Sequence, residues 1–459
     1  MIQIIIIIHP KKTTMKNYLL ISLIFISTIS AFGQDKNFDL SKYKLPDIKR
    51  HQLDFSISSD GSRSSSKTTK TVNSEMEEKN SVYSRNDSQA NLSYSYLYNT
   101  RKQIFEISSY LSPNFYHRKS TEGSNTILTS NPDLNFNAWG AFSLYKNGSK
   151  LFLHVQPYLH SYFDSDLRKI NNQIDRKIKA NSGKAEVSFG LGIGRIEPVS
   201  DFWQSYYILE KLKTHNLLSR ELKGDDIYEF ATLVSKLKNK RFFDFRERKI
   251  AELTALDSFL HKQKLVQNTD VACFTTISDY WNFAEIKYRQ SGSELKVLLR
   301  PGYEFGSRKE LDIEKSKTHS TSLSSIISYY NHKTINLHWD RGGAINSSEK
   351  IIIDGTNEEL PTNYFSISAG MGYDYLPNFR TSISSRLHYE GSELVLYGND
   401  MPSKHWVNSL NLNIDVKYYV SPQFQVSASV NSSFRDKSST TTKNVFYTYY
   451  SLGLNYAIF

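Results

Sequence analysis

Cysteine and long apolar runs are what this 459-residue chain has least of. Cys273 is the single cysteine, so no intramolecular disulfide can form and a disulfide-stapled scaffold is excluded. A helical membrane bundle is excluded as well, because a spanning helix needs about 20 consecutive apolar residues and only the N-terminus offers such a run. The mean hydropathy of -0.48 and the 22% of charged residues agree with this conclusion.

Motifs of catalysis, nucleotide binding and nucleic-acid binding are also missing. No G-x-S-x-G, H-E-x-x-H, Walker-type or G-x-G-x-x-G phosphate motif occurs in a suitable context. His154 and His160 are about 20 Å apart on one predicted strand, too far to share a metal ion. The formal net charge is +11, but the positive residues are scattered and are not interleaved with base-stacking rings. We therefore predict no catalytic residue, no cofactor, no metal site and no nucleic-acid partner.

The N-terminus is typical of an exported protein. From Met15 it has a basic residue, Lys16, then an apolar stretch and small residues before Gln34, which is the pattern of a secretory signal peptide. We interpret residues 1–33 as upstream residues and a signal peptide cleaved after Gly33, with an uncleaved anchor helix as the alternative. No cysteine stands at the cleavage site, so a lipoprotein is excluded.

The chain is rich in aromatic side chains, and its apolar and polar residues alternate along most of its length. It contains 30 Tyr and 26 Phe against 5 Trp. From about His51 onwards, outside one central stretch, apolar and polar residues alternate in blocks of about ten, as in a sheet with a different solvent on each face. The clearest block is 410–418, where Leu, Ile, Val and Tyr alternate with Asn, Asp and Lys. Rings at both membrane interfaces of a barrel would account for the Tyr and Phe excess.

Loop lengths separate a membrane barrel from a soluble sandwich, which also alternates. We predict fourteen strands, at about 51–58, 90–98, 103–116, 134–145, 151–163, 185–194, 294–305, 320–330, 334–341, 363–374, 379–390, 407–419, 423–434 and 446–458. Five connections are short, at 99–102, 146–149, 331–333, 376–378 and 420–423. Seven are long and polar, at 59–89, 117–133, 164–184, 306–319, 342–362, 391–406 and 435–445. Short periplasmic turns and long external loops are typical of an outer-membrane barrel, so both termini are expected on the periplasmic side.

The mature chain, apart from its central stretch, therefore resembles the Gram-negative outer-membrane β-barrel proteins. Its end reads YYSLGLNYAIF, a strand with a terminal aromatic residue as in that family, although Phe459 is out of phase with the apolar row. The resemblance implies an all-β transmembrane antiparallel barrel of about 14 strands, embedded in outer-membrane lipid and inserted by the barrel-assembly machinery. Fourteen-stranded relatives include monomeric porins and long-chain fatty acid transporters, but no motif peculiar to either is present.

The central stretch, residues 196–291, changes to a helical period. Ile227, Phe230 and Val234 lie on one face of an amphipathic helix, and three further helices are expected around it. Because it follows the sixth strand, this α-helical insertion between strands 6 and 7 should emerge in the periplasm, where it would meet a periplasmic protein or peptidoglycan. The alternative is a lumen plug, which the glycine row 190–194 would admit by close approach of the backbone.

These assignments divide the chain into five parts. Residues 34–50 form an N-terminal periplasmic segment, 51–195 hold barrel strands 1–6, and 292–459 hold strands 7–14. Ten charged or histidine residues are candidates for lining the lumen: Glu106, His154, Glu186, Lys296, Arg300, Glu304, Arg380, Arg386, Asp415 and Lys417. The cations could favour anions in the lumen, or the acids could pair with them and leave a neutral network.

Three classes of function follow. The first is a channel or transporter for a small solute, or an envelope component with a helical periplasmic domain. The second is a structural barrel with a closed lumen that docks a periplasmic partner. An outer-membrane enzyme is the third, and the sequence offers no residues that can be paired by spacing to support it.

Overall fold

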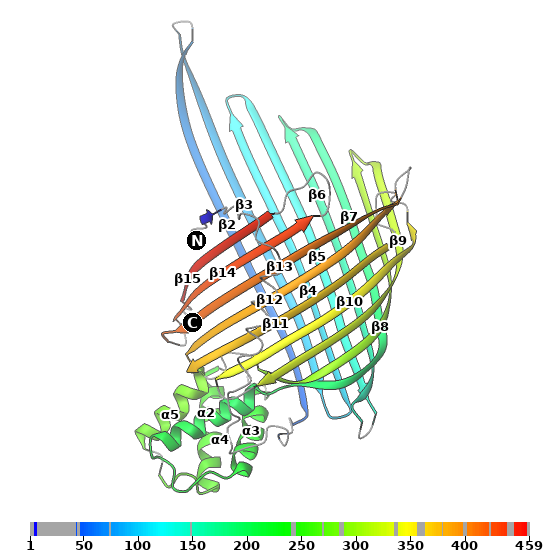
Figure 1. Cartoon of the computed structure of the whole chain (residues 1–459). Helices are drawn as coiled ribbons and strands as arrows, with labels where there is room; N and C mark the ends of the chain where they lie inside the picture. The colour runs from blue at the N-terminus through cyan, green and yellow to red at the C-terminus, as the bar shows by residue number, and fades with distance from the viewer. Residues whose placement is uncertain are drawn as a thin grey trace.

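The computed structural model describes most of the chain after residue 45. The described residues are 4–6, 43, 46–72, 75–146, 149–239, 245–268, 270–283, 289–334, 338–355, 363–378, 380–397, 402–421, 424–437 and 445–456. Fifteen strands and four helices lie within them (Figure 1). The expected signal peptide from Met15 to Gly33 and the terminal Phe459 lie outside the described residues.

Fourteen long strands form one antiparallel meander. They are β2 (Ile48–Val72), β3 (Glu75–Asn99), β4 (Gln103–Glu122), β5 (Asn125–Tyr145), β6 (Leu151–Ile170), β7 (Gln173–Pro198), β8 (Gln290–Glu310), β9 (Ile313–Thr334), β10 (Trp339–Gly355), β11 (Asn363–Asn378), β12 (Thr381–Tyr397), β13 (Pro402–Tyr419), β14 (Phe424–Lys437) and β15 (Val445–Tyr456). Each pairs with the next in sequence order. The predicted fold class is confirmed, with about 14 strands and helices inserted between the sixth and seventh.

The sheet curls into a barrel with a seam between its first and last long strands (Figure 1). The hydrogen-bonded order of the long strands runs from β2 to β15, and no described ladder joins these two. A three-residue strand, β1 (Ile4–Ile6), pairs instead with Thr448–Tyr450 of β15. The seam explains why outward apolar residues at the two edges, such as Phe55 and Leu452, are among the most exposed of the sheet.

The structure corrects the predicted long loops, including 342–362 and 391–406, into which β10, β12 and β13 extend, and four other loops are corrected almost completely. Most of 59–89, 117–133, 164–184 and 306–319 continues the strands as tall hairpins, closed at Gly123-Ser124, Asn171-Asn172 and Leu311-Asp312 in the last three. In the last two hairpins both turn residues have positive φ, between 48° and 66°, which matches the right-handed twist of a two-residue hairpin. These segments have no apolar alternation because both of their faces are polar, so sequence periodicity cannot find them.

Two boundaries in the second half also differ from expectation. The turn predicted at 331–333 is strand, since β9 continues to Thr334 and β10 starts at Trp339 rather than at residue 334. The polar residues Asn331, His332 and Lys333, which indicated a turn, belong to β9.

Aromatic side chains form two levels on the outer face of the sheet. Near the short turns, rings follow one another from His51 through Tyr96 and Phe105 to Phe142, and Trp339 stacks on Tyr375. Farther along, Phe365 of β11 stacks on Trp406 of β13. Tyr375 and Phe365 are ten residues apart on β11, which is about 33 Å along the strand and about 25 Å in height at a tilt near 40°.

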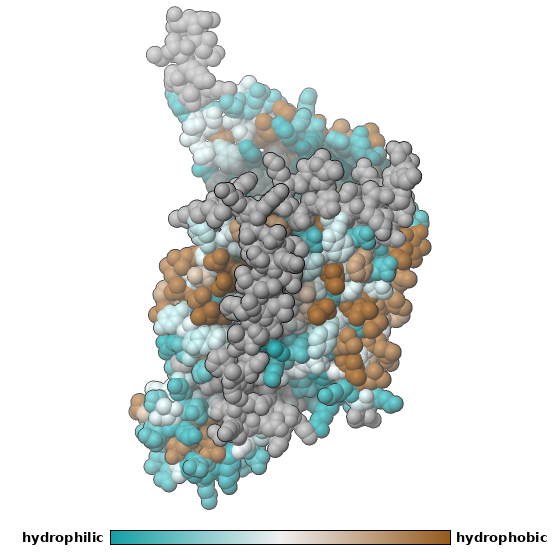
Figure 2. All heavy atoms as spheres, viewed as in Figure 1, coloured by the Kyte–Doolittle hydropathy of each residue, from teal (hydrophilic) through white to brown (hydrophobic). Residues whose placement is uncertain are grey.

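Apolar side chains fill the outer face between these two levels. Figure 2 shows them on the flanks of the barrel, with hydrophilic surface beyond them and over the helices. They include Leu153, Val187, Phe189, Leu191, Ile193, Val297, Leu299 and Ile327, all more than a third exposed. A band of this height, bordered by rings, is the lipid-facing surface of an outer-membrane barrel.

The four helices form a separate domain with its own core. They are α2 (Ser200–Thr214), α3 (Gly224–Lys238), α4 (Phe245–Lys262) and α5 (Val271–Phe283). Their buried side chains form one cluster, in which Phe202, Leu209 and Phe230 are fully covered. Tyr43, from the segment before β2, joins this core and contacts Phe202 at a ring distance of 5.2 Å. Among the described residues, no helix has the length and apolarity needed to cross a membrane.

The helical domain lies beyond the end of the barrel that carries the short turns (Figure 1). The strands that bound it, β7 and β8, both reach that end at Pro198 and Gln290. The helices therefore stand outside the wall of strands. The lumen-plug alternative does not describe this arrangement.

Candidate functional site

Backbone register decides which predicted site residues face the lumen. His154 of β6 lies opposite Gly190, and Gly190 lies opposite Leu298 of β8. Paired residues of neighbouring strands lie on the same face, so each ladder carries this inward face to the next strand. The inward face also contains Glu186, Lys296, Arg300, Glu304, Glu106, Arg386, Asp415 and Lys417. Nine of the ten candidates thus share the concave face of the sheet.

Charged inward residues on β7, β8 and β10 form a connected network. Lys184 Nζ lies 2.9 Å from Glu186 Oε1 and 3.1 Å from Glu304 Oε1. Lys350 Nζ contacts the same Glu304 oxygen at 3.4 Å. Because each carboxylate has a cation beside it, this part of the lumen carries little net field for anions.

Three more predicted residues have partners on the same face. Arg300 Nε donates to Ser188 Oγ at 2.7 Å, and its Nη1 lies 4.0 Å from Glu186. Lys296 Nζ contacts Glu294 Oε1 at 2.6 Å and faces the ring of Tyr330. Arg386 Nη2 contacts Asp374 Oδ1 at 3.2 Å. Of the two arrangements left open by the sequence, these contacts favour the neutral network.

The inward side chains of β2 to β8 are closely packed near the short turns. Inward residues at this end are buried even though they line a lumen: Ile48, Asn99, Ser143, Tyr145, Phe152, His154 and Leu298. His154 Nδ1 lies 2.9 Å from Ser143 Oγ, and the Tyr145 and Phe152 rings are 4.9 Å apart. Side chains of the wall therefore pack against one another at this end of β2 to β8.

An arginine joins strands that are not neighbours in this closure. Arg195 of β7 donates from Nη2 to Asn99 Oδ1 at 2.7 Å and to the Thr100 carbonyl at 2.8 Å, at the end of β3. Its guanidinium also lies 4.8 Å from the centre of the Tyr145 ring. Three strands separate β3 from β7 in the sheet order, so this contact crosses the curved wall.

The glycines at 190 and 192 of β7 leave room for the neighbouring strands of the barrel wall. A Cβ on Gly192 would lie 2.2 Å from the Phe152 ring, and one on Gly190 would lie 2.0 Å from the Val297 carbonyl oxygen of β8. The glycines therefore make room for a ring of β6 and for the backbone of β8. The close approach expected at this row comes from neighbouring strands and not from an inserted helix.

The inner wall of β11 to β15 has both buried and exposed polar side chains, and Asp374, Ser382 and Ser384 are among the buried ones. Lys417 is exposed, and Asp415 lies in register between Ser384 and Ser429. Hydroxyl and amide side chains dominate the neighbouring inward positions, among them Asn411, Asn431, Ser433 and Ser451. Exposed polar side chains on this half of the wall lie mainly on β13 and β14, as at Lys417 and Asn431.

Arg380, the tenth candidate, does not line the lumen. It precedes the first residue of β12, and its Nη2 donates to Asp279 Oδ1 of α5 at 3.3 Å. Its Nη1 donates to the Val420 carbonyl in the β13–β14 turn at 3.2 Å. The prediction is wrong because the alternation of β12 was extended one residue beyond its end, into the junction with the helices.

A buried ion pair holds the helical domain to the barrel. Arg289, just before β8, donates from Nε and Nη2 to the two oxygens of Asp340 on β10, both at 2.8 Å. Its guanidinium lies 4.3 Å from the centre of the Trp203 ring of α2, and its backbone N–H donates to Ser200 Oγ. Two parallel charge-assisted bonds fix both distance and orientation. Sequence reasoning missed this pair because neither residue belongs to a motif.

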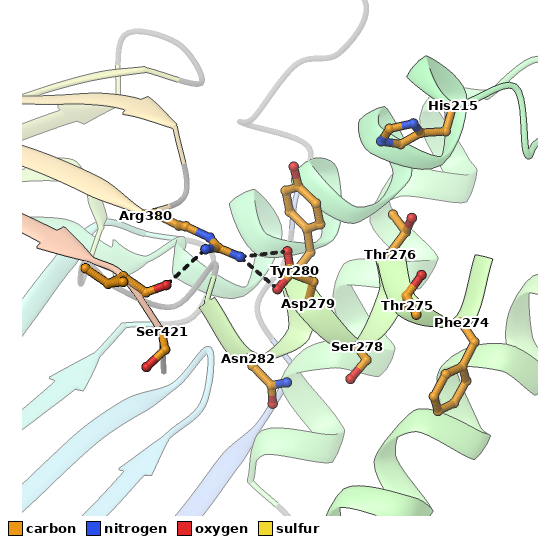
Figure 3. Close-up of a pocket in the computed structure, with 11 residues that line it drawn as sticks. His215, Phe274, Thr275, Thr276, Ser278, Asp279, Tyr280, Asn282, Arg380 and Ser421 are labelled. Atoms are coloured by element: carbon orange, nitrogen blue, oxygen red, sulfur yellow. Dashed lines mark hydrogen bonds and ion pairs between the residues drawn. The ribbon is translucent and has the colours of Figure 1, made fainter. Parts of the chain in front are cut away.

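A cleft of about 610 Å³ opens where α5 meets the barrel rim (Figure 3). Most of the residues that line it are of polar types: His215, Thr275, Thr276, Ser278, Asp279, Tyr280, Asn282, Arg380 and Ser421, with Phe274 and Val420 as apolar members. The Asp279–Arg380 pair crosses it, with each side chain about a third exposed. Burial and the nearby Asp279 charge raise the pKa of Tyr280 to about 12, so its hydroxyl is neutral at pH 7.

The helical domain also contains a titrating group with a clear partner. Arg220 Nη1 and Nη2 donate to the two Asp226 oxygens at 2.7 Å each, at the start of α3. This arginine, assisted by the Lys223 backbone N–H, lowers the pKa of Asp226 below its ordinary value.

Burial raises the pKa of the Cys273 thiol to about 11, so that thiol is protonated and unreactive at pH 7. Within the part of the chain that is described, no cluster of three or more His, Cys, Asp or Glu could hold a metal ion.

Comparison with protein-family models and with curated proteins gives no match. Among solved structures, the ferric yersiniabactin uptake receptor FyuA from Yersinia pestis aligns with 88% of this chain and 54% of its own length, at 9% identity and a TM-score of 0.38. The alcaligin outer membrane receptor FauA from Bordetella pertussis aligns with 89% of this chain and 66% of its own, at 8% identity and 0.36. OmpT of Vibrio cholerae, expressed in the outer membrane, aligns with 90% of this chain and 99% of its own length, at 8% identity and a TM-score of 0.27. The chain thus spans about half the length of FyuA.

The architecture follows from the chain's own geometry. Fourteen meandering antiparallel strands, an apolar outer band about 25 Å high, rings at both of its borders and a polar inner face together define an outer-membrane β-barrel. The resemblance inferred from the sequence is confirmed at this level.

Proposed function

We propose that the protein is an outer-membrane anchor that presents its helical domain to the periplasm as a docking platform. The observation that carries this proposal is the way the domain is mounted. It has a complete core of its own, yet Arg289–Asp340 and Asp279–Arg380 fix it against the rim at two places. A domain meant to move freely would not need a buried bidentate pair at its attachment.

The packed half of the lumen supports the same proposal. Tyr145, Phe152 and His154 are packed into the inner wall next to the helical domain, and Lys184 farther along is paired with Glu186 and Glu304. A barrel built this way serves as an anchor more readily than as a wide pore.

The orientation of the platform is part of the proposal. Short turns are periplasmic in outer-membrane barrels, and the helices emerge at the end that carries them. In this orientation the strands contact outer-membrane lipid, the barrel-assembly machinery inserts them after export, and the domain faces a periplasmic protein or the peptidoglycan.

The cleft residues provide the first test. A photo-crosslinking amino acid at Phe274, half exposed at the cleft, should form adducts in the producing cell with a periplasmic component. The matched control is Ile250 on α4, which is more exposed but does not line the cleft. Co-sedimentation of the detergent-solubilised full chain with purified peptidoglycan then distinguishes a glycan partner from a protein partner. Adducts that are equally abundant at both positions, or absent at both, would contradict docking at this cleft.

A channel for a small solute is the second candidate function. One observation favours it: the inward side chains of β11 to β14 are polar and partly exposed, as at Lys417 and Arg386. The full chain in planar bilayers would then carry a current whose ion preference changes on Lys417→Glu. No current from the correctly folded barrel would dismiss this candidate and leave the docking platform standing. We propose no catalytic role.

A further inference from the structure

The inner face of β4, β5 and β6 has a panel without acidic residues, lysines or arginines, which we name the neutral panel. It comprises the inward positions from 108 to 116 on β4, 135 to 145 on β5 and 152 to 162 on β6. On β7 it is bordered by Lys184 and Glu186, which pair with each other at 2.9 Å. The three strands lie inside the sheet order, away from the seam between β2 and β15. The neutral panel thus differs from the charged network beside it on β7, β8 and β10.

The inward rings of the neutral panel are of two kinds. Near the short turns, Tyr145 is 6% exposed and Phe152 is 1% exposed, so these rings fill space within the wall. Farther along the strands, Trp139 of β5 and Tyr110 of β4 are each 37% exposed. A ring that only fills the wall is covered by its neighbours. Trp139 and Tyr110 are therefore open toward the lumen.

The open rings lie on two neighbouring inward rungs of the sheet. In one rung, Asn137 of β5 lies between Tyr110 of β4 and His160 of β6. In the next rung, Trp139 lies directly opposite Tyr158. Strands are about 4.8 Å apart and successive inward residues of one strand about 6.6 Å apart, so the two rungs cover about 10 Å by 7 Å. An area of this size fits one or two sugar rings.

Polar groups between the rings are held by hydrogen bonds. Tyr110 Oη donates to Asn91 Oδ1 of β3 at 2.7 Å. Asn137 Nδ2 donates to Tyr158 Oη at 3.3 Å. A side-chain amide has two N–H donors and a carbonyl with two lone pairs, and this bond uses one donor. The Asn137 amide is thus oriented beside Trp139 with further capacity to donate and accept.

Open rings beside oriented amides suit one class of ligand. One face of a sugar ring carries C–H groups that pack on an aromatic side chain, and its hydroxyls donate and accept hydrogen bonds as Asn and Tyr do. A charged solute would lose water here without gaining a counter-charge from the neutral panel. An apolar solute would cover the Asn137 amide and leave it without partners.

We propose that the neutral panel binds an uncharged oligosaccharide, with Trp139 and Tyr110 as stacking rings and with Asn137 and Tyr158 as hydrogen-bonding groups. The site needs access from only one end of the lumen, so it is compatible with an anchor as well as with a channel. It lies on the inner wall of the barrel and is independent of docking at the cleft between α5 and the rim.

The test measures binding of three neutral probes, maltohexaose, cellotetraose and tetra-N-acetylchitotetraose, to the full chain by isothermal titration calorimetry. The chain is solubilised in a detergent without a sugar headgroup, which would compete for the site. We expect saturable binding of at least one probe, with little dependence on salt, and weakening of at least about tenfold on Trp139→Ala. Tyr449→Ala is the matched control and should leave binding unchanged. It removes an inward ring of β15 that is 40% exposed and lies outside the neutral panel.

A second variant separates a sugar from an apolar ligand. Asn137→Leu keeps the approximate size of the side chain but removes the amide, and it should weaken binding about fivefold through lost hydrogen bonds. Unchanged or tighter binding in this variant would overturn the proposal in favour of an apolar ligand. The proposal is also overturned if none of the three probes binds, or if Trp139→Ala and Tyr449→Ala weaken binding equally. Heat-modifiable gel mobility checks that each variant is folded, and crosslinking at Phe274 should be unaffected in all of them.

Discussion

The helical domain and the barrel wall use the same aliphatic residues in opposite ways. In the helices, Leu209, Leu256 and Leu260 are fully buried, and the surface around them is charged. In the wall, Leu191 is 53% exposed and Val297 54% exposed on the outer face, while Ser188 and Ser322 are buried on the inner face. One region folds by removing apolar side chains from water into a core, and the other by removing them into lipid.

This comparison explains how one chain can be poor in apolar runs and still be a membrane protein. A helical core needs apolar residues along only one stripe of each helix, and a barrel wall needs them at only every second residue of each strand. Neither pattern requires consecutive apolar residues. The junction at Arg289 is where the two regions meet, and there the contact is ionic.

Loss of the junction pair should have the largest effect. Asp340→Ala leaves the buried Arg289 guanidinium without its bidentate partner, which costs about 3–5 kcal/mol for a buried pair. We expect trypsin to separate the helical domain from the barrel much faster, with unchanged heat-modifiable gel mobility of the barrel. Asp374→Ala is the control, because its partner Arg386 is about half exposed and such pairs contribute about 1 kcal/mol or less. Equal cleavage rates in the two variants would show that the pair does not hold the domain.

Truncation in the helical core comes next. Leu256→Ala removes a fully buried side chain and should lower the free energy of unfolding of the helical domain by about 2–5 kcal/mol. Hydrogen exchange of the α2–α5 amides in the detergent-solubilised protein measures this loss. Leu191→Ala removes the same atoms from the lipid-facing surface and should leave those amides as protected as before. If Leu191→Ala exposed them equally, the two regions would not be energetically separate.

A charge on the outer face gives the third test. Val297→Arg places a cation between the two levels of rings and should cost about 2–4 kcal/mol in a bilayer. Folding yield into lipid vesicles across a urea series measures the cost. Asn431→Arg, at a comparable height on the exposed inner face, should change the midpoint little. A similar loss for both would contradict the assignment of outer and inner faces.

The same contrast explains what the sequence could predict. Alternation located the membrane-spanning part of most strands, because lipid and water lie on opposite faces there. The helical stripe of Ile227, Phe230 and Val234 located α3, and all three side chains are buried in the core. In both cases the signal comes from a boundary between two solvents.

Where both faces meet water, no such signal exists. Residues 59–67 read as a loop because they are polar throughout, yet they form a regular ladder with β3. Contacts between distant segments were equally invisible: Tyr43 in the helical core, Arg195 with Asn99, and Arg289 with Asp340. Nine of the ten candidates lie on the concave face of the sheet, the face that their phase in the strands predicted, and Arg380 lies before the first residue of β12.

The smallest expected effect is a pH dependence confined to the helical domain. Arg220 lowers the pKa of Asp226 below its ordinary value near 3.8, so the ionised carboxylate is favoured in the folded state. The stabilisation is fully present above the unfolded pKa and is lost as the pH falls through the lower, folded pKa. Because Arg220 is partly exposed, the contribution is about 1 kcal/mol or less.

Asp226→Asn should remove that acid-dependent part of the stability, measured as the shift between pH 6 and pH 3 in α3 hydrogen exchange, and should leave the barrel unaffected. Asp225→Asn, an exposed neighbour at the same helix terminus, is the control. It should retain the pH-dependent shift, because its carboxylate lies outside the bidentate contact with Arg220. If the two variants lose the shift equally, the cause is the general charge of the helix terminus and not the Arg220–Asp226 pair.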